Sequence, residues 1–356
     1  MKYSSSEAET GLPWMCAGPS CFLSSGDGYV GELLKLQQAQ APAATAAPAP
    51  ESTPEPTEAP APESVEVNIL VLNGTTGFGM AKLMDDAAKD EASPYTVGVE
   101  TDASNIAAAL VSGECDIAAL PTNAAAALYN KTQGGVRMLA INTRGVLYLV
   151  ADTEKLSVNG WEDLEGRTVY APAQNPSFIF KALADKAGAD VTIDNTYAAP
   201  ADLRTALAAG EVDLAVLPEP MVTIARAANE KLSPVMDLTE EWETVQQLGS
   251  LVQGCAVVRS DFAAEHPEAV AAFLADYGRS IDFLLENTQE AAQMIEQNGI
   301  FQKAAVAAKA VPNCNICFLT GEEMAEAMDS FCEAMFAVNP ASVGGALPGE
   351  DFYYLG

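Results

Sequence analysis

One stretch of this chain occurs twice, and the repetition constrains the fold more than any other feature of the sequence. Residues 111–128 read VSGECDIAALPTNAAAAL, and residues 208–225 read AAGEVDLAVLPEPMVTIA. Identical residues recur in pairs that lie 97 positions apart: Leu110 and Leu207, Gly113 and Gly210, Glu114 and Glu211, Asp116 and Asp213, and Pro121 and Pro218. A unit repeated at the length of a small domain predicts two lobes of similar construction.

Both copies of the repeat predict the same order of local structure. A helix ends at the Gly-Glu pair, because glycine commonly closes a helix in the left-handed conformation. A short apolar strand follows the shared Asp and stops at Leu-Pro, since proline cannot extend a central strand. The residues just past the strands, Thr122 and Asn123 in one copy and Glu219 in the other, begin the next helix.

Strands and helices alternate along the body of the chain. In the first half we expect a buried strand in 65–74, a helix in 77–90, a strand, turn and helix in 95–114, a strand in 115–120, a helix in 122–131, and two strands in 136–152 around a break at 142–145. Asp102 or Ser104 can cap the helix before Gly113. The second half repeats strand, loop and helix in 167–188, 191–211 and 212–229, and residues 269–299 are helical. This order predicts two α/β lobes, each with a parallel sheet flanked by helices.

The strand ends predict where a ligand binds. In open α/β sheets, ligands bind beyond the carboxyl ends of the strands, often against helix N-termini. Pro121 and Pro218 mark such an end in each half of the chain. Two lobes that face each other across these edges form one cleft. The repetition therefore predicts a ligand cleft built from both halves of the chain.

Composition narrows the classes of function. The chain of 356 residues has 18 Lys and Arg against 49 Asp and Glu, a formal net charge of −31. A chain this acidic repels phosphate backbones, so we expect no nucleic-acid binding. No apolar run reaches the length of about 18 residues that a membrane-spanning helix needs. The one histidine, His266, stands at a helix start and argues against a histidine-based metal site or catalytic triad.

Seven cysteines give no dense disulfide framework. Cys314 and Cys317 form a lone C-x-x-C, and a zinc site would want a second such pair. A local disulfide, free thiols and a metal site stay open at this point. Inert or locally paired thiols rank first and a metal site last, and we expect neither a metal nor a cofactor.

Residues 1–64 differ from the rest of the chain. Residues 38–64 are rich in Ala, Pro, Thr and Glu and contain no aromatic residue, so we expect a disordered, extended tether. The start of the chain has Lys2 but no apolar run, and so lacks a recognisable signal peptide. Cys16 resembles the anchoring cysteine of a bacterial lipoprotein, although Pro13, Trp14 and Met15 before it do not fit the usual pattern.

From residue 65 onward the chain resembles the solute-binding proteins of ABC importers. The similarity is to the nitrate/sulfonate/taurine and thiamine-precursor branch of the type II periplasmic-binding fold. It is carried, in order, by SGECDIAALPTNAAAALYN, INTRGVLYLVAD, SVNGWEDLEGRTVYAP, LAAGEVDLAVLPEPMV and SDFAAEHPEAVAAFL. The run WEDLEGRTV, residues 161–169, is the most specific single piece.

The resemblance implies a two-lobed fold whose ligand cleft lies between doubly wound α/β lobes. It places lobe I in residues 65–147 plus 251–356 and lobe II in 148–250, with crossings near 146–151 and 249–257. Closure about the crossings would trap a small solute. The implied protein is a monomeric, non-enzymatic, extracytoplasmic component, tethered at the membrane, which passes its solute to an ABC permease.

The family's ligand loops, carried over by position, give the candidate site. They fall in six segments of this sequence, which supply Asn73, Thr75, Thr76, Phe78, Thr122, Asn123, Asn142, Arg144, Gln174, Asn175, Ser177, Glu219, Ser250 and Gln253. Several have a purely structural explanation as well: the glycine-rich residues 73–79 make a tight turn, and Asn175 or Ser177 can cap a helix.

The charge of the solute stays open. Arg144 suits an anionic head group by bidentate pairing, although a lobe carboxylate would occupy it equally well. Glu219 suits a ligand with amine or amide donors, such as an aminopyrimidine, and is also explained as a solvated loop carboxylate. Phe178, Tyr148 and Tyr197 can stack on a ring, but aromatic residues near strand ends more often belong to the core.

Two other functions compete with transport. Pyrimidine-precursor synthases of fungi share this fold, but they need a cysteine-rich motif and an active-site histidine that the C-x-x-C and His266 do not supply. A solute sensor that reports to a partner without transport would have nearly the same sequence. A dinucleotide enzyme is a weaker option, because Gly74, Gly77 and Gly79 lack the G-x-G-x-x-G spacing.

Overall fold

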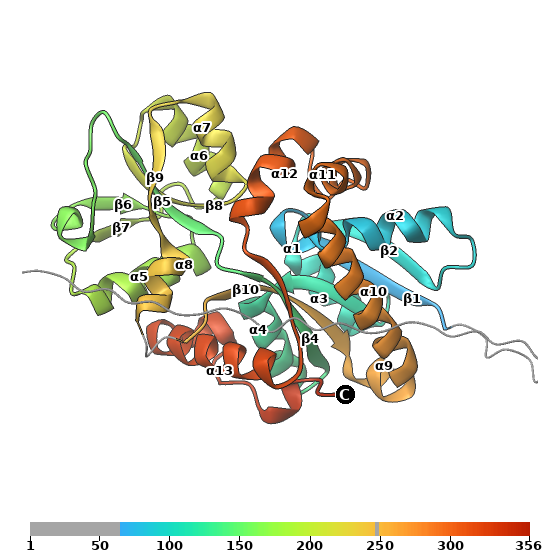
Figure 1. The fold of residues 1–356 in the computed structure, drawn as a ribbon. Coiled ribbons are helices and arrows are strands. Elements are labelled where there is room, and N and C mark those ends of the chain that lie inside the picture. The colour runs from blue at the N-terminus through green and yellow to red at the C-terminus, as the bar shows by residue number, and fades with distance from the viewer. Residues whose placement is uncertain (1–64, 246–248) are drawn as a thin grey trace, which may run out of the picture. The chain divides into compact units, whose positions relative to one another are not determined.

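The chain builds two β-sheets and passes between them twice. The structure, a computed structural model, describes residues 65–245 and 249–356, and in these residues the strands form a six-stranded and a five-stranded sheet. The six-stranded sheet has the order β11-β4-β10-β3-β1-β2, and the five-stranded sheet has the order β7-β6-β8-β5-β9. We call the parts built on them lobe I and lobe II (Figure 1).

Lobe I holds both ends of the described chain. Its strands are β1 (Val67–Leu72), β2 (Tyr95–Glu100), β3 (Ile117–Pro121), β4 (Val136–Arg144), β10 (Val252–Arg259) and β11 (Ile316–Leu319). Its helices are α1 (Thr75–Phe78), α2 (Ala81–Lys89), α3 (Ala103–Ser112), α4 (Thr122–Thr132), α9 (Ser260–Glu265), α10 (Pro267–Glu286), α11 (Thr288–Gln297), α12 (Ala304–Ala310) and α13 (Gly321–Val338), with short 3-10 turns η2 (Val311–Asn313), η3 (Pro340–Val343) and η4 (Glu350–Phe352).

Lobe II is a single continuous segment. Its strands are β5 (Leu147–Asp152), β6 (Thr168–Tyr170), β7 (Thr192–Asp194), β8 (Leu214–Pro218) and β9 (Leu232–Asp237). Its helices are α5 (Asn175–Ala187), α6 (Pro200–Ala209), α7 (Met221–Ala228) and α8 (Leu238–Thr244), preceded by the 3-10 turn η1 (Trp161–Leu164).

The two sheets share one plan. In lobe I, β1 lies parallel to β2 and β3, and β10 is antiparallel to β3 and β4. In lobe II, β6 lies parallel to β7 and β8, and β5 is antiparallel to β8 and β9. The α/β class with two lobes is confirmed, but the sheets are mixed where the sequence predicted parallel ones. The reason is the crossing: a strand that arrives from the other lobe enters at the carboxyl edge and must run backward.

The repeated residues have the same structural role in both lobes. Gly113 and Gly210 end α3 and α6 in the left-handed region, with φ of 81° and 75°. The carbonyl oxygen of Asp116 accepts a hydrogen bond from the Arg259 backbone at 2.9 Å, as that of Asp213 does from Asp152 at 3.1 Å. The repeated Asp therefore ties β3 to the end of β10 and β8 to the end of β5, its antiparallel neighbour in each case.

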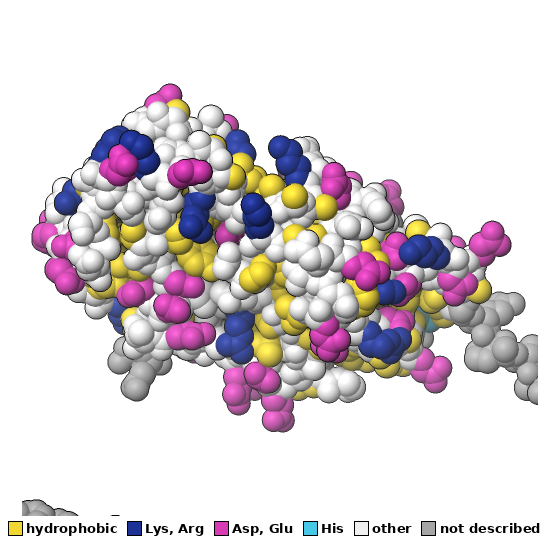
Figure 2. Space-filling view, turned by 45° about the horizontal axis from the view of Figure 1, so that its top comes forward, with side chains coloured by type: hydrophobic (Ala, Val, Ile, Leu, Met, Phe, Trp, Pro, Cys, Tyr) yellow, Lys and Arg dark blue, Asp and Glu magenta, His cyan; other side chains and the backbone are white. Residues whose placement is uncertain are grey.

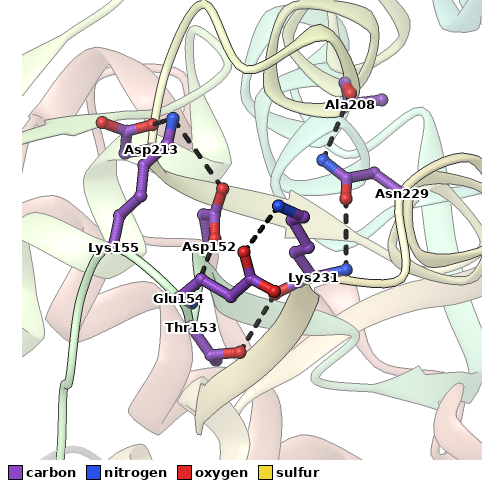
Figure 3. A network of polar contacts seen from close by, with 8 residues as sticks. All are labelled: Asp152, Thr153, Glu154, Lys155, Ala208, Asp213, Asn229 and Lys231. Atoms are coloured by element: carbon purple, nitrogen blue, oxygen red, sulfur yellow. Dashed lines mark hydrogen bonds and ion pairs between the residues drawn. The ribbon is translucent and has the colours of Figure 1, made fainter.

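The carboxylates of this pair also find equivalent cations. Asp116 lies 3.6 Å from Arg259, at the end of β10, and Asp213 lies 2.6 Å from Lys155, just past the end of β5. Figure 3 shows the Asp213 side, where Lys155 also lies 3.8 Å from Asp152. These contacts lie at the amino ends of β3 and β8, so the Asp of the repeat has a structural role. The Leu-Pro pair lies at the opposite, carboxyl end of each strand.

One hydrophobic cluster runs through both lobes. It joins residues of α3, α4 and α13 in lobe I to residues of β5, α5 and α8 in lobe II. Trp242 of α8 and Phe331 of α13 are fully buried in it, with ring centroids 6.3 Å apart. Two further clusters each stay within a single lobe. The lobes are thus joined by packed apolar side chains on one side as well as by the two crossings.

The structure does not test the predictions about the N-terminal tether and the exact lobe boundaries. The tether and the Cys16 anchor predicted for residues 1–64 lie outside the described residues. The exact lobe boundaries stay a prediction; the chain leaves β4 at Arg144, enters β5 at Leu147 and returns to lobe I at β10. Strands β9 and β11 were not among the elements predicted from the sequence.

Across residues 65–245 and 249–356, no helix combines the length and apolarity needed to cross a membrane. Acidic side chains are scattered over the face shown in Figure 2.

Candidate functional site

A pocket of about 220 Å³ lies where the carboxyl ends of the strands of both lobes meet. Lobe I and the first crossing contribute Thr75, Thr76, Pro121, Asn123, Thr143, Val146 and Gln253, and lobe II contributes Ala173, Gln174, Asn175 and Pro176. Larger hollows of about 490 and 1100 Å³ lie on lobe I alone, one lined by α2 and α10 and the other by α3 and α4. Closure of two lobes cannot shut a hollow that belongs to one of them, so the shared pocket is the candidate site.

Two helices begin at the pocket without a side-chain cap. Helix α4 starts after Pro121 and helix α5 after Gln174, and neither residue caps its helix through a side-chain hydrogen bond. Asn175 and Ser177, which the sequence offered as caps, bond elsewhere. The first N–H groups of a helix need partners and favour negative charge. Gln174 has φ of 68°, a region that non-glycine residues rarely adopt and that often marks functional sites.

A hydrogen bond joins the lobes across the pocket. The Asn175 side-chain Nδ2 donates to Oδ1 of Asn123 at 2.8 Å. The Oδ1 atom of Asn175 is buried and has no hydrogen-bond partner among residues 65–245 and 249–356. A buried acceptor without a partner costs free energy, about 1–3 kcal/mol, unless a ligand supplies a donor. Asn175, which lines the pocket from lobe II, therefore carries an acceptor that the described residues leave unpaired.

Six of the residues expected from the sequence line this pocket. They are Thr75, Thr76, Asn123, Gln174, Asn175 and Gln253. Gln253 also holds the first crossing, because its Oε1 accepts a hydrogen bond from the Val146 backbone at 2.7 Å. With that oxygen occupied, the amide N–H groups of Gln253 remain available as donors.

Four other expected residues have buried side chains that bond or pack within the protein. Phe78 is fully buried and meets Phe301 edge to face. Thr122 donates its hydroxyl to the Val252 carbonyl at 2.8 Å, and Ser177 donates to that of Pro172 at 2.7 Å. Asn142, 1% exposed, donates to Thr76 and Tyr277. Asn73 and Ser250 lie at a strand end and in the return segment, outside the pocket lining.

The two charged candidates lie away from the pocket lining. Arg144 is one-third exposed and lies 3.8 Å from Glu243 of α8 and 3.9 Å from Glu323 of α13. Glu219 is 4% exposed and accepts hydrogen bonds from the Thr223 backbone at 3.0 Å and from its hydroxyl at 2.9 Å. Burial raises the pKa of Glu219, although these bonds act in the opposite direction. Each charge is thus engaged by protein groups.

Among the described residues, none that lines the pocket has an ionisable side chain. Within the described residues, no group of three or more His, Cys, Asp and Glu is arranged to hold a metal ion. The five described cysteines are free thiols, and burial raises the pKa of Cys317 to about 11 and that of Cys115 to about 12. The pocket thus offers neutral donors, neutral acceptors and helix N-termini.

Sequence reasoning gave little weight to several lining residues. Val146 and Ala173 are apolar and contribute mainly backbone, so they carry no chemical signal in the sequence. Thr143 belongs to the candidate loop 142–144, of which the list of site residues includes Asn142 and Arg144. The sequence placed this segment correctly and could not tell which of its side chains faces the cleft. Phe178, Tyr148 and Tyr197 do not line the pocket.

Comparisons with known proteins point to one fold. A family model described as NMT1/THI5 like matches residues 95–291. No curated protein sequence matches the chain. The structure of an ABC transporter protein from Parabacteroides distasonis is similar with a TM-score of 0.71 and 23% identity, over 82% of this chain and 99% of that chain.

Two further solved structures extend the comparison. The periplasmic aliphatic sulphonate-binding protein of Escherichia coli has a TM-score of 0.62 and 15% identity, over 81% of this chain and 96% of that chain. A Candida albicans protein described as having the generic periplasmic binding protein fold has a TM-score of 0.51 and 12% identity, over 81% of this chain and 93% of that chain. At these identities the likeness is one of fold.

Proposed function

Because the chain belongs to the NMT1/THI5-like family, we propose that it is the solute-binding component of an ABC importer. It captures a small solute between its lobes and delivers it to a membrane permease. The observation that carries the proposal is the pocket, which is lined from both lobes and bridged by the bond between Asn175 and Asn123. Binding of a solute there stabilises the closed arrangement by adding contacts to both sides at once.

The chemistry of the pocket supports a solute with an anionic or electronegative end. The N-termini of α4 and α5 supply backbone N–H groups, and Gln253 supplies amide donors. No carboxylate lines the pocket to repel an anion. The Escherichia coli protein of similar fold is named for aliphatic sulphonates, which agrees with this class.

Binding without chemical change is part of the same proposal. The described residues of the pocket lining include threonine hydroxyls but no His, Lys, Asp or Glu, so none of these hydroxyls has an adjacent base in the lining. His266 stands between α9 and α10 against the ring of Phe262, with centroids 5.0 Å apart, and is not part of the lining. We place the protein outside the cytoplasm, held at the membrane through its N-terminal segment, as a monomer that binds no nucleic acid and works with a permease.

A thermal-shift screen tests the function. The panel contains taurine, alkanesulfonates, nitrate, bicarbonate, aminopyrimidines, flavins and polyamines. A solute that binds only the native state adds about 2.7 kcal/mol at a hundredfold excess over Kd, so the Tm rises. If no member of this panel raises the Tm, solute capture in the pocket is not supported.

Asn175→Ala tests the site. It removes the bridge to Asn123 and the buried acceptor, so we expect the affinity for any hit to fall about tenfold, as for the loss of one or two hydrogen bonds. Asn159→Ala is the matched control, because Asn159 is an exposed asparagine of lobe II whose side chain bonds to its near neighbours Ser157 and Asp163. Equal affinities for both variants and the wild type would place the solute elsewhere.

A further inference from the structure

Asn142 sits directly behind the pocket and contacts two of its walls. It is 1% exposed, and its Nδ2 donates to the carbonyl oxygen of Thr76 at 3.1 Å and to the hydroxyl of Tyr277 at 2.8 Å. Its Oδ1 accepts the hydroxyl of Thr143 at 2.9 Å. Thr76 of α1 and Thr143 of β4 both line the pocket, whereas Asn142 does not.

The orientation of the Asn142 amide follows from these partners. A carbonyl oxygen can only accept, so the amide nitrogen must face Thr76, and Oδ1 must face Thr143. The Thr143 hydroxyl has a single proton, and that proton goes to Oδ1 of Asn142. Any polar contact between Thr143 and a solute therefore uses the lone pairs of Thr143 Oγ1 as an acceptor.

Local backbone geometry holds this arrangement in place. The pairing of β4 with β10 is irregular at Gly254, which lies opposite Thr143. A Cβ at position 254 would clash with Oδ1 of Asn142 and would come within 3.0 Å of Thr143 Cβ and Oγ1. Irregular strand pairings of this kind re-aim side chains next to binding sites. The glycine thus leaves room for the Asn142–Thr143 pair in its observed orientation.

A second acceptor comes from the opposite lobe. The buried Oδ1 of Asn175 has no partner among the described residues, and Asn175 lines the same pocket. Asn175 on one side thus lacks a hydrogen-bond donor, and Thr143 on the other side can offer a solute only an acceptor. A bare oxyanion such as nitrate offers acceptors only, and would leave both oxygens unpaired.

We propose that the solute carries an O–H or N–H donor that Thr143 and Asn175 accept, and that Asn142 is the positioning residue that makes Thr143 an acceptor. This inference rests on the proposed solute-binding function and narrows it to donor-bearing small anions. Asn142 sets the specificity without touching the solute.

Matched pairs of anions test the inference on the full chain. Bicarbonate and nitrate are both small, planar and singly charged, and only bicarbonate has an O–H group. The second pair, 2-hydroxyethanesulfonate and 1-propanesulfonate, has nearly one shape and one charge and differs in the same way. By titration calorimetry at mildly alkaline pH, we expect the donor-bearing member of at least one pair to bind about tenfold more tightly.

Variants separate positioning from structural support. Thr143→Val keeps the shape but removes the acceptor, and Asn142→Leu frees the Thr143 proton, so both should reduce the ratio of affinities within a pair. Thr143→Ser keeps the hydroxyl and should restore the ratio. Tyr277→Phe removes the third partner of Asn142 but leaves its bonds to Thr76 and Thr143, so it should lower the Tm and leave the ratio unchanged.

The outcomes distinguish this inference from the proposed function. Equal binding within each pair by the wild type, or a ratio that Thr143→Val leaves unchanged, would overturn the inference. Failure of all four anions to bind would overturn it too. If another member of the screening panel still raised the Tm, solute capture itself would stand.

Discussion

At the scale of single residues, Glu219 shows that a buried charged group can have a structural role where the sequence suggests ligand binding. The sequence offers it as a cleft acceptor, yet the structure surrounds it with Thr223 and with Asn313, whose Nδ2 lies 3.4 Å from Oε1. Asn313 belongs to η2 of lobe I, and its carbonyl also accepts the hydroxyl of Tyr148 at 2.9 Å. Glu219 is therefore a contact between lobes rather than part of the pocket lining.

The raised pKa of Glu219 predicts a pH dependence of stability. Burial raises its pKa in the folded state above the ordinary value of 4.5, so the native protein holds this proton more tightly than the unfolded chain does. The resulting stabilisation is complete below pH 4.5 and is lost as the pH rises through the folded-state pKa. We expect the free energy of unfolding of the wild type to fall relative to that of Glu219→Gln over this range.

Urea unfolding of both proteins at acidic and neutral pH measures this difference. Glu230→Gln is the control, because Glu230 is an exposed carboxylate of the same lobe and the substitution removes the same charge. A constant difference between the wild type and Glu219→Gln at all pH values would contradict the assignment.

At the scale of elements, the repeat is one structural unit used in two environments. Each copy ends a helix at glycine, starts a strand after Asp and stops it at proline. The burial of the Asp differs between the copies: the Asp116 side chain is 10% exposed, and that of Asp213 is 45% exposed. Asp116 also accepts the Asn68 backbone N–H at 2.8 Å, and so joins β3 to β1.

This difference predicts unequal costs for the same substitution. Asp116→Ala removes the ion pair with Arg259 and the hydrogen bond from Asn68. We therefore expect the free energy of unfolding to fall by about 2–3 kcal/mol. Asp213→Ala breaks a pair that is half exposed and screened by water, so we expect a loss below about 1 kcal/mol. Denaturant unfolding of the two variants gives the comparison directly. Equal losses would mean that burial does not control the value of this contact.

At the scale of the whole molecule, two crossings and one shared core join the lobes. Gly145 lies in the first crossing, where an added Cβ would approach Leu251 within 2.6 Å and would also collide with Thr239 Oγ1. Asn315 donates to the Gly145 carbonyl at 2.7 Å, which fixes the crossing from the side of lobe I. The crossing is therefore closely packed, and movement between the lobes must preserve these contacts or break them together.

Removal of residues 1–64 tests whether the described body is self-sufficient. The two sheets and three hydrophobic clusters of the described residues lie within 65–245 and 249–356, so we expect the shortened chain to keep the Tm of the full chain to within a few degrees. We also expect it to bind any solute identified in the screen with unchanged affinity. Calorimetric melting and titration of the two chains measure this, and unfolding of the shortened chain would refute the tether assignment.

Much of the fold could be predicted because it depends on local chemistry. Glycine that closes a helix and proline that stops a strand act within a few residues, so the repeat placed β3, α4, β8 and α7 correctly. The short strand β11 escaped notice, because Ile316–Leu319 has few residues and follows a 3-10 turn. The antiparallel direction of β5 and β10 also escaped, since direction depends on where the chain enters the sheet.

The candidate site also combines features that the sequence predicts with features that it does not. Gln174 and Asn175 follow a strand end and line the pocket as expected, whereas Ser177, two residues farther along α5, turns inward to Pro172. Asn142 and Thr143 are neighbours in the sequence, but one is held behind the pocket by Thr76 and Tyr277 and the other lines it. Which face of an element meets solvent, core or cleft is set by the elements packed against it.

The sequence by itself determined the two α/β lobes and the strand end at Pro121 that lines the candidate pocket, because helix ends and strand ends are set by a few neighbouring residues. Only the tertiary structure decided which polar side chains reach the pocket and which protons they keep. Those properties depend on partners far away in the chain, such as Tyr277 for Asn142 and Asn123 for Asn175. They also depend on burial, because an unpaired polar group costs more free energy when it is buried.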